Sequence, residues 1–106
     1  MSKYLFKASY NTEGLKGLKQ AGAASRAAVV SETCKSVGGS LESFHFAFGK
    51  VDVFAICDLP DDETAAAVAF TIGASGAVEL ETVKLLTVEQ ADAAMGRSVS
   101  YRPPGS

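Results

Sequence analysis

The chain has 106 residues, enough for one domain of ordinary size and too few for two. Hydrophobic residues make up 47% and charged residues 21%, which is typical of a globular protein and excludes a disordered chain. Ten lysines and arginines against twelve acidic residues give a net charge of -2 with no basic cluster, so we expect no nucleic-acid partner.

The cysteines and apolar runs bear on the compartment. Cys34 and Cys57 are too few for a disulfide framework and lack metal-ligand spacing, which favours a reducing compartment. Residues 1–7 contain no long apolar run, so we expect no signal peptide. The longest apolar run, residues 65–70, is too short to cross a bilayer. These features predict a cytoplasmic protein that binds no membrane.

The N-terminal part predicts a strand and a broken helix. Apolar and aromatic side chains alternate through residues 3–10, as in a half-buried strand. Its two faces are formed by Tyr4, Phe6, Ala8 and Tyr10 and by Leu5, Lys7 and Ser9. Asn11 can cap a following helix, which we expect to break near Gly22. A second helix has an apolar stripe at Ala23, Ala27, Val30, Cys34 and Val37. Gly38 and Gly39 end it.

Residues 43–48 and 51–57 predict a β-hairpin. Gly49 and Lys50 suit a two-residue type II′ turn, which pairs His45 with Phe54 and Ala47 with Asp52. The first of these strands places its phenylalanines on the face opposite His45. The second is apolar on both faces, as in an interior strand.

The remaining elements complete a familiar order. An acidic start at residues 59–63 predicts a helix through residue 72, and residues 77–86 predict a fourth strand. Thr87 and Gln90 match a capping box that opens a short helix ending at Gly96. The order β-α-β-β-α-β indicates an α+β, ferredoxin-like sandwich over residues 1–97, followed by an extended or disordered tail at 98–106.

Such a fold leaves one face of the sheet without helices. Phe54 and Ile56 make that face apolar, so we expect a second copy of the chain to cover it. The sequence therefore predicts a homodimer or a higher homo-oligomer.

Several short motifs, in order, resemble the GYD domain family. They are Phe-Gly-Lys-Val-Asp-Val at 48–53, Asp-Leu-Pro-Asp-Asp-Glu at 58–63, an alanine-rich helix with Gly73, Glu81-Thr82, and Tyr-Asn-Thr-Glu-Gly at 10–14. The tyrosine of the Gly-x-Tyr-Asp signature is replaced by Val51. The resemblance covers about residues 4–92 and implies the dimeric α/β-barrel group, which includes cofactor-free monooxygenases, isomerases and ligand-binding modules. It implies no particular activity.

His45 is the one histidine and the obvious acid or base at neutral pH. The hairpin register places Asp52 on its face as a diagonal neighbour, where a carboxylate could orient the ring or increase its basicity. His45 and Asp52 are therefore the candidate catalytic residues. The alternatives are a half-buried structural histidine, and an aspartate that accepts backbone N–H groups near the turn.

The candidate ligand-binding residues are Lys7, Ser9, Tyr10 and Phe54. Lys7 in a mostly apolar strand suggests a polar pocket, and its alternative is a snorkelling side chain or an ion pair with Glu79 or Glu81.

Two function classes remain open. One is the binding of a small apolar or aromatic molecule, with or without acid-base chemistry by His45. The other is a structural or regulatory oligomer without turnover. We expect no metal site, because the candidate ligands lie on different elements. We expect no cofactor, because phosphate-binding and dinucleotide motifs are missing. We interpret both cysteines as small residues of the core.

Overall fold

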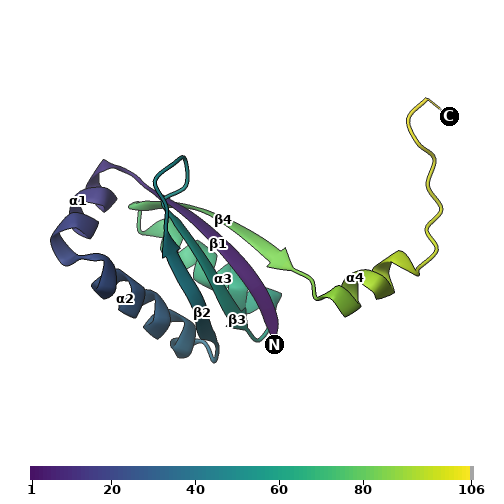
Figure 1. Cartoon of the computed structure of the whole chain (residues 1–106), viewed down its shortest axis with the longest axis horizontal. Coiled ribbons are helices and arrows are strands. Elements are labelled where there is room, and N and C mark those ends of the chain that lie inside the picture. The colour runs from purple at the N-terminus through teal and green to yellow at the C-terminus, as the bar shows by residue number, and fades with distance from the viewer. Residues whose placement is uncertain (106) are drawn as a thin grey trace.

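A computed structural model describes residues 1–105 and places four strands and four helices along them. The strands are β1 (Ser2–Tyr10), β2 (Ser40–Phe46), β3 (Val53–Leu59) and β4 (Val78–Leu85). The helices are α1 (Thr12–Ala21), α2 (Ala23–Ser36), α3 (Asp62–Ala74) and α4 (Val88–Met95). The strands form one antiparallel sheet in the order β2-β3-β1-β4 (Figure 1). This arrangement confirms the predicted α+β, ferredoxin-like fold.

The two faces of the sheet differ in what covers them. On one face, β1 and β3 contribute buried side chains that pack against α2 and α3. These side chains are Tyr4, Phe6, Ala8, Val53, Ala55, Cys57 and Leu59. On the other face, which we call the open face, the helices provide no cover and the apolar side chains are only half-buried. They include Leu5, Phe54, Ile56 and Val83.

The predicted helix boundaries are set by side-chain caps and glycines. Asn11 accepts a hydrogen bond from the Gly14 backbone N–H and begins α1. Gly22, with a φ of 94°, separates α1 from α2, which confirms the expected break. Asp61 accepts from the Thr64 backbone N–H at the start of α3, and Thr87 with Gln90 forms the capping box of α4.

The β2–β3 hairpin keeps the predicted register but not the predicted turn. His45 lies opposite Phe54, and the Ala47 N–H donates to the Asp52 carbonyl. The type II′ turn is wrong, because it needs a positive φ at Gly49 and that glycine has none. The loop is instead held by β1, where the Asp52 N–H donates to the Ala8 carbonyl and Ser9 donates to the Lys50 carbonyl. β2 consequently covers residues 40–46 instead of 43–48.

A cluster of polar side chains joins helix α3 to strands β1 and β4. Asp62 in α3 accepts hydrogen bonds from the Lys84 ammonium group and the Tyr4 hydroxyl. These two hydrogen bonds lower the pKa of the Asp62 carboxyl, and the one from Lys84 has the larger effect.

Strand β3 extends to Leu59, which is fully buried. Leu59 therefore belongs to the strand and not, as expected, to the start of the helix.

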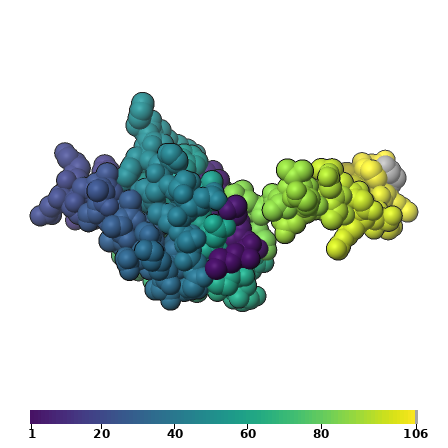
Figure 2. Space-filling model, turned by 60° about the horizontal axis from the view of Figure 1, so that its bottom comes forward, coloured from purple at the N-terminus to yellow at the C-terminus, as the bar shows by residue number. Residues whose placement is uncertain are grey.

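The segment after β4 extends away from the sheet and its helices (Figures 1 and 2). The radius of gyration, 16.7 Å, exceeds the roughly 13 Å of a compact chain of this length. Residues 98–105 of the expected tail form no helix or strand, and Ser106 lies outside the described residues. Across residues 1–105, every helix falls short of the length and apolar character required to span a bilayer.

Candidate functional site

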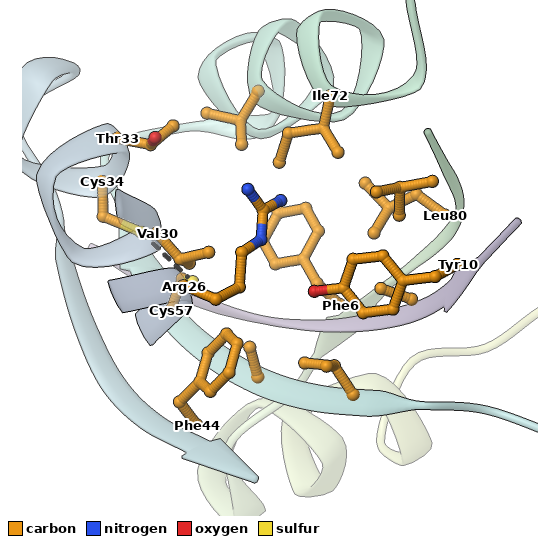
Figure 3. A pocket seen from close by; sticks show the side chains of 15 residues that line it. Phe6, Tyr10, Arg26, Val30, Thr33, Cys34, Phe44, Cys57, Ile72 and Leu80 are labelled. Atoms are coloured by element: carbon orange, nitrogen blue, oxygen red, sulfur yellow. Dashed lines mark hydrogen bonds between the residues drawn. The ribbon is translucent and has the colours of Figure 1, made fainter. Parts of the chain in front are cut away.

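A narrow cavity lies between the covered face of the sheet and helices α2 and α3. Its volume is about 40 Å³, and part of it opens to solvent. Its floor includes Phe6, Ala8, Val53 and Ala55, and its walls include Val30 and Cys34 of α2 and Val68 and Ile72 of α3 (Figure 3). The lining is almost wholly apolar, as is common for small-molecule sites.

The cavity follows from the side-chain sizes along the strands. In β1 and β3, every second residue faces the helices, and the register pairs Phe6 with Ala55 and Ala8 with Val53. The two alanines leave space that larger side chains at these positions would fill. Helix α2 contacts the sheet beside that space, where Cys34 lies against Cys57 of β3.

Arg26 is the charged residue of the cavity lining in the described chain. It lies four residues before Val30 on α2, so the two side chains share a helix face. Its guanidinium carbon lies 6.0 Å from the centre of the Tyr10 ring. The Nε atom is buried and has no hydrogen-bond partner within residues 1–105. Figure 3 shows the side chain reaching into the middle of the cavity.

Arg26 was missed by reasoning from the sequence. The stripe predicted for α2 includes Ala23, which is exposed, whereas the face that meets the cavity carries Arg26, Val30, Thr33 and Cys34. A signal was available, because a basic residue at helical spacing from Val30 and Cys34 interrupts an otherwise apolar face.

Two thiols meet at one end of the cavity. The sulfur atoms of Cys34 and Cys57 are 3.3 Å apart, and the two residues are 2% and 1% exposed. Burial raises the pKa of the Cys57 thiol far above its usual value, and the hydrogen bond with Cys34 raises it further. A thiol kept neutral is a poor nucleophile, which argues against a nucleophilic role for Cys57. Both cysteines belong to the buried core, as expected.

His45 and Asp52 are not in contact. His45 is exposed on the open face of β2. Asp52 instead accepts a hydrogen bond from the Tyr10 backbone N–H through Oδ2, at 2.9 Å. Within residues 1–105 neither a hydrogen bond nor an ion pair joins the two side chains. The structure therefore gives Asp52 the backbone contact that was the alternative to its catalytic role.

The four candidate ligand-binding residues lie on two different faces. Lys7 pairs with Glu81 on the open face, with Nζ and Oε1 3.7 Å apart, which confirms the expected ion pair. Ser9 and Phe54 share that face, and Ser9 is engaged with the β2–β3 loop. Tyr10 alone lines the cavity on the covered side. The sheet thus separates Tyr10 from Lys7, Ser9 and Phe54.

Residues 1–105 contain no group of three or more His, Cys, Asp or Glu side chains that could hold a metal ion. The cavity offers two thiols, one hydroxyl on Thr33 and one on Tyr10, and the Arg26 guanidinium.

Comparisons with known proteins identify the family of the chain. No curated protein and no solved structure matches it significantly. The family model of the GYD domain matches residues 4–95, from the first buried tyrosine of β1 to the end of α4. Because this match covers most of the chain, the protein belongs to the GYD domain family.

Proposed function

We propose that the protein binds a small, largely apolar molecule in the cavity between the sheet and helices α2 and α3. The observation that carries this proposal is the unfilled apolar space at the centre of the fold. Protein cores are close-packed, and apolar space without atoms lowers stability. A ligand that fills the space would restore those contacts.

The position of the ionisable groups favours binding over turnover. His45 lies on the opposite side of the sheet from the cavity, and no histidine or carboxylate is found among the cavity's lining residues. Acid-base chemistry on a ligand in this cavity would lack the groups that normally perform it. The positions of these residues therefore favour a protein that binds the ligand without transforming it.

A neutral probe tests the cavity directly. We expect 3-phenyl-1-propanol to bind the protein in a calorimetric titration and to shift the NMR signals of Val30 and Ile72. Ala55→Leu places a larger side chain on the cavity floor and should abolish binding. Ala67→Leu adds the same atoms on the exposed side of α3 and should leave binding unchanged. Equal binding of the alcohol to Ala55→Leu would contradict the proposal, and so would failure of both the alcohol and its carboxylate analogue, 3-phenylpropionate, to bind.

We also propose that the open face associates with a second copy of the chain. Its half-buried apolar centre, with Leu5, Phe54 and Ile56, is flanked by charges of both signs. Lys3 pairs with Glu42 and Asp58 at one end, and Lys7 with Glu81 at the other. An apolar centre with a mixed-charge rim is the usual anatomy of a protein interface, and a two-fold axis can match such a rim to itself.

A further inference from the structure

Resting on the proposed ligand cavity, we propose that its ligand is an anion, a carboxylate on a short apolar or aromatic body, and that the Arg26 guanidinium binds the carboxylate. The inference rests on the buried and unpartnered Nε–H of this half-buried cation, on the lack of a counter-ion beside it and on the apolar walls around it.

The first step is the unsatisfied donor. Guanidinium groups carry five N–H donors and stay charged at any physiological pH. The Nε–H of Arg26 is buried without a partner in the described chain, although buried polar groups in folded proteins nearly always have one. A ligand oxygen at this place would supply the missing acceptor.

The second step is charge. Residues 1–105 contain no salt bridge to Arg26, and its cavity lining includes no acidic residue. A neighbouring cavity, between α1, α2 and the end of β1, also touches Arg26 and includes Glu13. The Glu13 side chain is 84% exposed and faces Lys16, with Oε1 3.8 Å from Nζ. The arginine is thus a cation with room for an external anion.

The third step is the state of the other polar groups. The Thr33 hydroxyl donates a hydrogen bond to the Val29 carbonyl of its own helix, and the free thiols of Cys34 and Cys57 are hydrogen-bonded to each other. Tyr10 lies with its ring against the guanidinium, which limits the orientations that Arg26 can adopt. A planar guanidinium held in this way matches the two oxygens of a carboxylate. The apolar walls then suit the hydrocarbon or aromatic part of the same molecule.

Two probes that differ only in the terminal group separate this inference from the proposed function. We expect 3-phenylpropionate to bind the protein at pH 7 roughly tenfold to a hundredfold more tightly than 3-phenyl-1-propanol in calorimetry, as for a hydrogen bond to a charged group. Arg26→Met should remove this preference and keep the binding of the alcohol. Lys35→Met removes an equal charge from the exposed side of α2, where Lys35 faces Glu32, and should preserve the preference.

Each outcome decides one of the two proposals. Equal affinity of the two probes for the unaltered protein, or an unchanged preference in Arg26→Met, overturns the anionic ligand and leaves the cavity proposal standing. No binding of either probe overturns the cavity proposal and this inference with it. Circular dichroism establishes that Arg26→Met is folded. Arg26→Lys retains the charge without the guanidinium fork and should show a reduced preference.

Discussion

Asp52 illustrates how one side chain can replace a missing strand partner. Its carboxylate accepts the Tyr10 N–H at the point where β1 leaves the sheet, and its own N–H donates to the Ala8 carbonyl. The residue therefore joins the β2–β3 loop to the end of β1. His45, seven residues earlier, projects from the same face of the hairpin into solvent.

Substitutions at these two positions should have very different effects on stability. Asp52→Ala leaves the part-buried Tyr10 N–H without its acceptor and should lower the free energy of unfolding by roughly 1–3 kcal/mol. Asp52→Asn retains an acceptor oxygen and should recover part of that loss. His45→Ala removes an exposed side chain and should change the free energy by less than about 0.5 kcal/mol. Urea denaturation measures all three, and an equal loss at both positions would show that His45 has a structural role.

Residue-level prediction from the sequence succeeds where strand alternation decides the outcome. The pleat correctly assigns Lys7 and Ser9 to one face and Phe6 and Ala8 to the other. It leaves Glu79 and Glu81 as alternative partners of Lys7, and the structure selects Glu81. The pleat cannot show that the Asp52 carboxylate turns toward a backbone N–H of a strand far away in the sequence. The sequence shows Arg26 at helical spacing from Val30 and Cys34, but it does not show that this side of α2 faces the cavity, since the rotation of α2 over the sheet depends on packing.

At the scale of the elements, Gly14 and Gly17 in α1 look alike in the sequence but have different surroundings. A Cβ atom on Gly14 would lie 2.3 Å from the Ala77 carbonyl oxygen, because the first turn of α1 packs directly on the connection between α3 and β4. The Asn11 N–H donates to that same carbonyl and fixes the approach. A Cβ on Gly17 would meet no atom within 4 Å.

Gly14→Ala and Gly17→Ala should therefore shift stability in opposite directions. Gly14→Ala forces two backbone segments apart and should cost roughly 1–3 kcal/mol. Gly17→Ala restricts the unfolded chain without a clash and should raise the free energy of unfolding by roughly 0.4–1 kcal/mol. Urea midpoints with unchanged slopes provide the measurement. Stabilisation by Gly14→Ala would mean that α1 does not pack on Ala77 in solution.

The same distinction explains how much of the element pattern can be predicted. Helix caps and helix breaks depend on neighbouring residues in the sequence. The cap at Asn11, the break at Gly22 and the capping box at Thr87 can therefore be predicted from the sequence. The conformation of the β2–β3 loop depends on a residue far away in the sequence, because the Ser9 hydroxyl of β1 donates a hydrogen bond to the Lys50 carbonyl. A turn type deduced from Gly49 and Lys50 alone is wrong for that reason.

At the scale of the whole molecule, apolar surface remains in several places, two of which bear on assembly. One is the open face of the sheet, with Phe54 on interior strand β3 between His45 of β2 and Lys7 of β1. The other is the segment after β4, where Leu86, Val88 and Met95 are exposed. A single chain leaves both partly exposed, and Figure 2 shows the segment after β4 extending away from the rest of the molecule. Association through the open face would remove the first of these surfaces from water, which is the main driving force for assembly.

Phe54→Lys should abolish this association while the domain stays folded. A lysine at the centre of the open face would have to lose its hydration at the interface, and loss of a central aromatic side chain typically weakens an interface by roughly thirtyfold or more. Phe70→Lys, on the exposed side of α3, is the matched control and should leave assembly intact. Sedimentation velocity at micromolar concentration distinguishes the species. A monomer for the unaltered protein, or a dimer that survives Phe54→Lys, would exclude the open face as the interface.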